Sequence, residues 1–200
     1  MDERNRQRLL EDEFHRQLRA RAEVLVRGPL PADRVIIESV PDGIDGVRAT
    51  LMRLERFERD LLERLPGTRA VQLRFDKRVL GGLLRRNVGR VRGQLLAPTE
   101  RLLNDETPGP VSREIVLDAL ARYELMPRRD RPTGVIFASA TGFTPEARAL
   151  VNTPGPTQVM LVGAREDGGW DVDMPATIRR TPWARLLEFE TQDDLLKRLQ

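Results

Sequence analysis

Residues 134–145 decide the fold; they read Gly134-Val135-Ile136-Phe137-Ala138-Ser139-Ala140-Thr141-Gly142-Phe143-Thr144-Pro145. The first seven form a largely apolar run with β-branched members, which is typical of a strand buried on both faces of a sheet. Thr144 followed by Pro145 predicts a helix N-terminus, because the hydroxyl can cap free N–H groups and proline is tolerated in the first turn. A buried strand that leads into a helix favours an α/β fold, with helices flanking a central sheet.

Further elements are predicted on both sides of this stretch. Alternating or apolar patterns predict strands over 34–40, 69–75, 158–163 and 170–173, the last two joined by a turn at Asp167-Gly168-Gly169. Apolar residues at helical spacing predict helices over 2–26, 47–65, 79–104, 112–125, 144–152 and 191–199. We expect a charged helix over 1–30, an α/β core over 31–175 with a helical insertion near 98–131, and a tail over 176–200 with a short helix.

The composition of the 200 residues excludes several kinds of site. The absence of cysteine excludes disulfides, thiol nucleophiles and thiolate zinc sites, and a single histidine argues against a histidine metal site or a catalytic triad. We expect that histidine, His15, on a helix surface, and Trp170 and Trp183 in packing roles. No run of about 18 apolar residues predicts a membrane span, and the charged N-terminus lacks the apolar centre of a signal peptide, so we expect a cytoplasmic protein.

Three polar residues are candidates for phosphodiester chemistry. Such chemistry needs carboxylate oxygens for Mg²⁺ and a cation for the charged transition state. Asp45 lies in a glycine-flanked turn, and Gln72 and Arg74 are two residues apart on one face of a predicted strand. A site exists if that face meets Asp45. The alternative is structural, because Asp-Gly is a common turn dipeptide and polar residues on a solvent face need no function.

The segment 69–101 is strongly basic. It contains nine basic and two acidic residues, a net charge of +7, in a chain whose net charge is +3. Arg78, Arg85 and Arg92 recur every seven residues, which places them on one face of the helix predicted there. Such a stripe can neutralise phosphates, which makes DNA binding steeply salt-dependent. The alternative is a solvated helix face, or one paired with the N-terminal helix. The candidate nucleic-acid-binding residues are Arg78, Arg85, Arg86, Arg90 and Arg92.

A second kind of anion site is conceivable where the 134–140 strand enters the next helix. Ser139, Thr141 and Thr144 supply hydroxyl groups beside a helix N-terminus. A nucleotide-sensing domain is a third hypothesis on this basis, although no glycine-rich fingerprint accompanies it. The alternative is an ordinary capped turn.

Several stretches, in this order, resemble Mrr-type restriction endonucleases of the PD-(D/E)xK superfamily over roughly 34–165. Asp42-Gly43-Ile44-Asp45-Gly46 resembles their G-G-I-D-G segment, and Val71-Gln72-Leu73-Arg74 their V-Q-x-K strand. Residues 88–93 are similar to the helix that follows it, and 134–147 resemble their G-V-F-[IV]-T-T-S-x-F-[ST]-x-E-A segment. Arg74 departs from this pattern because it stands in place of lysine, and guanidinium does not replace an amine.

The resemblance implies a restriction-endonuclease-like mixed sheet, Mg²⁺-dependent DNA cleavage, Asp45 as a metal ligand and Gln72 as the second metal position. Arg74 would then stabilise charge in the transition state. Lys77 is a substitute for the missing lysine only if it reaches the site from the opposite strand face. The first hypothesis is therefore a DNA-binding protein with a degenerate nuclease site. The second is a non-catalytic assembly module that kept the fold and binds a protein partner, or itself, through the N-terminal helix.

Overall fold

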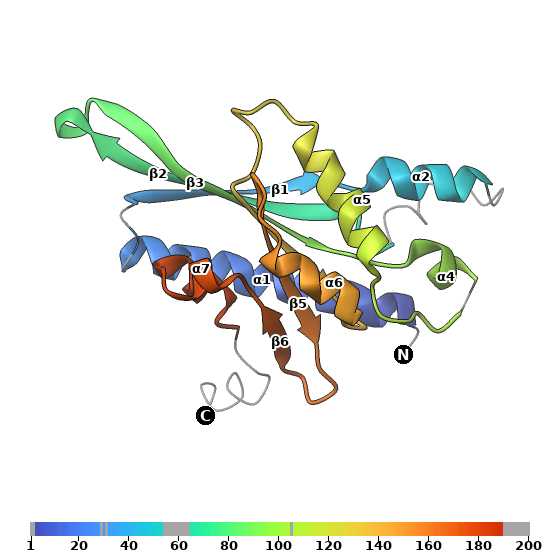
Figure 1. Ribbon diagram of the computed structural model, residues 1–200. Coiled ribbons are helices and arrows are strands. Elements are labelled where there is room, and N and C mark those ends of the chain that lie inside the picture. Colours follow the sequence, from blue (N-terminus) through green and yellow to red (C-terminus); the bar gives the residue numbers. More distant parts are fainter. Residues whose placement is uncertain (1–2, 29, 31, 54–64, 105, 190–200) are drawn as a thin grey trace.

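A computed structural model of the chain describes residues 3–28, 30, 32–53, 65–104 and 106–189. Within them, six strands form one mixed sheet whose spatial order is the chain order (Figure 1). The first three strands form an antiparallel meander, the third to fifth are parallel, and the sixth returns antiparallel. The strands are β1 (Arg34–Pro41), β2 (Arg69–Val79), β3 (Leu84–Leu95), β4 (Gly134–Ser139), β5 (Gln158–Ala164) and β6 (Trp170–Asp173).

Helices flank this sheet and make its parallel connections. A parallel pair needs a crossover, and α4 and α5 supply it between β3 and β4, within the insertion expected near 98–131. The expectation of a mixed sheet with flanking helices and an N-terminal helix is confirmed. The helices are α1 (Glu3–Arg27), α2 (Ile44–Arg53), α4 (Thr99–Leu103), α5 (Arg113–Glu124), α6 (Pro145–Ala149) and α7 (Ala176–Arg179), with short 3₁₀ helices η1 (Leu80–Gly82), η2 (Leu150–Asn152) and η3 (Pro182–Leu187).

Both faces of β4 are covered, which explains its unbroken apolar run. Ile136 and Ala138 enter a core formed with α1 and η3, whereas Val135 and Phe137 enter a second core formed with α5 and α6. Successive side chains of a strand point to opposite faces, so a strand between two cores needs apolar residues at every position. At its end, Thr144 accepts a hydrogen bond from the Ala147 backbone N–H at 3.3 Å, so the predicted helix cap is confirmed.

The N-terminal helix packs against the sheet of its own chain. Its apolar stripe, from Phe14 and Leu18 to Leu25, is buried in the first core. Close contact with β3 depends on Gly93, because a Cβ there would lie 2.3 Å from Leu18 Cδ2. The apolar stripe of α1 is therefore used within the chain, which weakens the hypothesis that this helix docks on a partner.

Two expectations for single residues had different outcomes. The prediction of a surface position for His15 is wrong, since its side chain is buried with 6% exposure beside the Phe14 ring. Trp170 and Trp183 do pack against the first core, as predicted.

The predicted helix over 79–104 is wrong. Residues 84–95 form strand β3, which pairs with β2 on one side and β4 on the other. The helix predicted over 47–65 begins earlier, at Ile44, and is described to Arg53. Residues 54–64 and the short helix predicted over 191–199 lie outside the described residues.

Candidate nucleic-acid interface

Gln72 and Arg74 share one face of β2, as their spacing predicts. Gln72 lies opposite Glu38 of β1 and Arg92 of β3, and Arg74 lies opposite Arg90. Both side chains are half-buried, and Arg74 Nε lies 3.3 Å from Asp76 Oδ2. The predicted strand pair therefore faces a row of cations on β3.

Asp45 does not join this face. It occupies the first turn of α2, its side chain is 94% exposed, and its carboxylate lies 3.7 Å from Arg48 of the same helix. No hydrogen bond or ion pair connects Asp45 with Gln72 or Arg74, three residues that the structure describes. Asp45 and the β2 pair are thus not assembled into one polar cluster.

The carboxylate that reaches the sheet belongs to Asp42, three residues earlier in the chain. Its side chain is 7% exposed, and Tyr123 of α5 donates a hydrogen bond to Oδ2 at 2.7 Å. Arg92 Nε lies 2.9 Å from Oδ2 and Arg122 Nη1 lies 3.6 Å from Oδ1. The Arg92 Nε–H makes no aligned hydrogen bond among the described residues, so its contact with Asp42 is an ion pair.

Gln94 of β3 completes this cluster. Tyr123 Oη lies 2.9 Å from Gln94 Oε1, but one hydroxyl proton serves one acceptor at a time, and the charged, nearer Asp42 is the stronger acceptor. Burial and the neighbouring Asp42 carboxylate raise the pKa of Tyr123 far above its ordinary value, so its hydroxyl stays protonated. Asp42, Arg92, Gln94, Arg122 and Tyr123 form what we call the Asp42 network.

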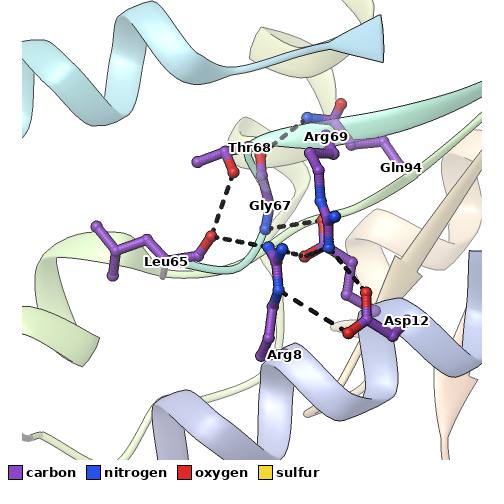
Figure 2. Close-up of polar contacts among 8 residues, drawn as sticks. Arg8, Asp12, Leu65, Gly67, Thr68, Arg69 and Gln94 are labelled. Atoms are coloured by element: carbon purple, nitrogen blue, oxygen red, sulfur yellow. Dashed lines mark hydrogen bonds and ion pairs between the residues drawn. The ribbon is translucent and has the colours of Figure 1, made fainter. Parts of the chain in front are cut away.

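The backbone of Gly67 links this network to α1 (Figure 2). Gln94 Nε2 donates to the Gly67 carbonyl at 3.2 Å, and the Gly67 N–H donates to Glu11 Oε1 at 3.3 Å. Glu11 also accepts a hydrogen bond from Arg8 at 2.9 Å. Burial raises the pKa of Glu11 to about 7, because the loss of hydration outweighs the attraction of Arg8 and Arg69.

The residues at hand do not fit the Mg²⁺ site that the resemblance implies. Magnesium favours carboxylate oxygens that are free to coordinate it. Asp42 is already contacted by two guanidinium groups, Asp45 is exposed beside Arg48, and Gln72 offers only an amide. The described part of the chain contains no group of three or more acidic or histidine side chains placed to hold a metal.

Arginines instead share the face of β2 and β3 that carries Gln72. On β2, Arg74 and Arg78 alternate with the core residues, and the register sets Arg90 opposite Arg74 and Arg85 opposite Arg78. A bulge at Val88 shifts the alternation of side chains by one residue, so Arg85 and Arg92 share a face although seven residues separate them. We call this set the arginine face: Arg74, Arg78, Arg85, Arg90 and Arg92.

Several cations lie directly opposite one another. Lys77 pairs across the strands with Arg86, Arg78 with Arg85, and Arg74 with Arg90. Like charges in opposite positions destabilise a sheet, by about 0.2–1 kcal/mol for a cross-strand pair. Lys77 and Arg86 lie on the face opposite the arginine face, so the predicted DNA-binding set is divided between two faces and Lys77 does not share the face of Arg74.

The hydroxyl groups at the end of β4 are engaged in local contacts. Thr141 donates its hydroxyl to the Gly109 carbonyl at 2.9 Å, and its N–H donates to Ser139 Oγ at 3.2 Å. Thr144 caps α6. These contacts fit the ordinary capped turn and give the nucleotide-sensing hypothesis no support.

Comparison with protein-family models, with curated proteins and with solved structures finds no match for this chain. The restriction-endonuclease-like fold and a nuclease activity therefore remain predictions. In the described ranges, no helix has both the length and the apolar character that crossing a membrane requires.

Sequence reasoning missed the residues that do assemble. Asp42 stands out in the sequence only as the first residue of the segment that resembles G-G-I-D-G, and Gln94 lies inside the wrongly predicted helix. The Gly81-Gly82 pair was the available signal, because two glycines between alternating stretches predict a hairpin. Tyr123 and Arg122 carried no sequence signal, since their partner Asp42 lies about eighty residues away.

Proposed function

We propose that this protein binds duplex DNA through the arginine face, without metal-dependent cleavage by the residues first predicted for it. The observation that supports binding is the arginine face itself. It is formed by two neighbouring strands, and only part of its charge is balanced by nearby carboxylates. Asp76 contacts Arg74, Asp130 contacts Arg90 and Asp42 contacts Arg92.

The cations at the outer end of the face support the same proposal. Among the described residues, the side chains of Arg78 and Arg85 have no hydrogen bond or ion pair, and both are exposed. Residues 77–90 contain five basic and no acidic residues. Facing cations that weaken a hairpin are favoured where a polyanion binds, because phosphates convert their repulsion into attraction.

The non-catalytic part of the proposal rests on the arrangement of the acidic side chains. A metal-dependent nuclease needs carboxylates free to coordinate a cation, and Asp42 is held by Tyr123, Arg92 and Arg122. The Asp42 network is then structural, and it fixes the position of Arg92 at the inner end of the arginine face.

Fluorescence anisotropy with a labelled duplex over a series of salt concentrations tests the binding. Each phosphate contact contributes about 0.9 to the slope of log K against log salt, so R78Q/R85Q should flatten the slope by about 1.8. The matched control is R179Q/R180Q, which removes the same charge from two exposed arginines at the end of α7. If both double variants change the slope equally, the binding depends on net charge and the arginine face is not the site.

Gel analysis of the same DNA with and without Mg²⁺ tests the absence of cleavage. We expect intact DNA in both samples. Mg²⁺-dependent cutting that is lost in Asp45→Ala, with DNA binding retained, would overturn the non-catalytic part and restore Asp45 as a metal ligand.

A further inference from the structure

The outer part of the β2–β3 hairpin projects from the sheet as a free ribbon. The pairing of β1 with β2 ends at Arg34 and Asp76, and β4 joins β3 only from Val91 onward. Between Lys77 and Arg86, the two strands pair only with each other in the described part of the chain, and at their base the Arg78 N–H donates a hydrogen bond to the Asp33 carboxylate at 2.5 Å. Figure 1 shows this ribbon extending beyond the other elements.

The end of the ribbon is apolar and exposed. Residues 79–84, which we call the hairpin tip, read Val79-Leu80-Gly81-Gly82-Leu83-Leu84. The exposed fractions are 70% for Leu80, 86% for Leu83 and 56% for Leu84. Three leucines clustered at one projecting end form an apolar patch that the rest of the described chain does not cover.

The backbone at the tip is also unusual. Leu80 has φ +52°, and Gly81 and Gly82 follow with φ +65° and +95°. Glycine adopts this left-handed conformation readily, whereas leucine does so at a steric cost. Strained backbone of this kind is concentrated at active sites, ligand clamps and switch regions.

Cations border the tip on both faces of the ribbon. Arg78 and Arg85 lie on the arginine face, and Lys77 and Arg86 lie on the other. Residues 77–86 contain these four cations and no acidic residue. An apolar end ringed by positive charge fits a target that combines an anionic surface with an apolar interior.

We propose that the hairpin tip inserts its leucines between base pairs of duplex DNA, unstacking a step and bending the duplex, while the flanking cations hold the phosphates. This inference rests on the proposed function and adds a deformation of the DNA to it. A two-stranded ribbon fits a DNA groove, and apolar wedges between base steps are an established means of bending DNA.

An anionic membrane has a similar combination of chemistry, but the length of the cation row favours DNA. Positive charge continues along the arginine face from Arg78 to Arg74 and its cross-strand neighbour Arg90, a span of about 14 Å at 3.4 Å per residue, whereas Arg92 beyond them is buried against Asp42. A tip inserted in a bilayer would leave the far cations well beyond a Debye length of about 8 Å. The phosphates of a duplex that follows the ribbon can reach the cations along this span.

Ligase-catalysed ring closure measures this bending without knowledge of a preferred sequence. A DNA fragment of about 100 base pairs is shorter than the persistence length of about 150 base pairs and closes poorly alone. We expect the wild-type protein to raise ring closure about tenfold or more. L80S/L83S/L84S should abolish that increase while keeping the salt slope of DNA binding. Leu125→Ser is the control, because Leu125 is 87% exposed at the end of α5, away from the hairpin.

The outcomes separate the two proposals. DNA binding without enhanced ring closure, or closure that persists in the triple variant, overturns the wedge and leaves the proposed function intact. No DNA binding at any salt concentration overturns both. The tip is assigned to membranes, and the wedge is overturned, by two results together. The wild-type protein sediments with phosphatidylserine vesicles and the triple variant does not, and the wild-type protein leaves DNA ring closure unchanged.

Discussion

Replacement of Glu11 by glutamine should change how the stability of this protein depends on pH. The Glu11 side chain is completely buried, and burial raises its pKa from 4.5 to about 7. Between these two pH values the folded state holds a proton that the unfolded state has lost. The free energy of unfolding therefore falls as pH rises, by about 1.4 kcal/mol per unit and about 3 kcal/mol in all.

His15, one helical turn away, acts in the opposite direction. Burial, followed by the nearby Arg69 charge, lowers its pKa from 6.5 to about 4. Between those values the unfolded state holds the additional proton, so the free energy of unfolding rises with pH. From pH 4.5 to 6.5 the two contributions have similar size and opposite sign. As far as these two groups determine it, the free energy of unfolding of the wild type is then nearly independent of pH. In Glu11→Gln only the His15 contribution remains, so the free energy of unfolding of that variant rises with pH.

Urea unfolding followed by the fluorescence of Trp170 and Trp183 measures this effect at several values between pH 4.5 and 7.5. The quantity compared is the free energy of unfolding of Glu11→Gln minus that of the wild type. This difference should increase by about 3 kcal/mol as pH rises over that range. The loss of the Arg8 contact adds an offset, and only the change with pH is used.

Glu13→Gln is the control, because hydrogen bonding to Arg16 lowers the pKa of Glu13. Its contribution changes below pH 4.5, so the difference between this variant and wild type should stay constant above it. If Glu11→Gln and wild type keep parallel profiles, Glu11 is hydrated in the folded state and the reasoning from burial is refuted.

Two substitutions test the packing. Gly93→Ala would place a Cβ 2.3 Å from Leu18 Cδ2 and should destabilise the protein by about 1–3 kcal/mol. Gly155→Ala is the control, because a Cβ there meets only ordinary contacts and should not destabilise the protein. Equal effects of the two substitutions in thermal unfolding would argue against α1 lying on β3. Tyr123→Phe keeps the ring but removes the hydroxyl donor to Asp42. It should lower the free energy of unfolding by about 1–3 kcal/mol, and a neutral result in urea unfolding would show that the Asp42 network does not stabilise the fold.

Local patterns were sufficient for most elements and misleading for one. Leu80, Leu84, Val88, Val91 and Leu95 repeat at helical spacing, which predicted a helix where β3 stands. Pairing with β2 and β4 overrides that local preference, because a strand between two others satisfies its backbone hydrogen bonds on both sides. The prediction that Arg78, Arg85 and Arg92 share one face is right, but that face belongs to two paired strands and not to a helix, and the pairing adds Arg74 and Arg90 to it.

Candidate-site prediction failed for a related reason. Asp42 and Asp45 are three residues apart in similar surroundings, and nothing local distinguishes the buried carboxylate from the exposed one. The distinction arises from the position of Asp42 at the end of β1, where Arg92 and Tyr123 reach it from β3 and α5.

The sequence by itself determined the apolar run of β4, the cap of α6, the amphipathic α1 and a concentration of positive charge between 69 and 101. Each depends on spacing within a short window, where helix and strand periodicities act directly. Only the tertiary structure decided that His15 and Glu11 are buried, that Asp42 rather than Asp45 meets the sheet, and that five arginines share a face. Those outcomes depend on strand register and helix packing, which bring together residues that are far apart in the chain.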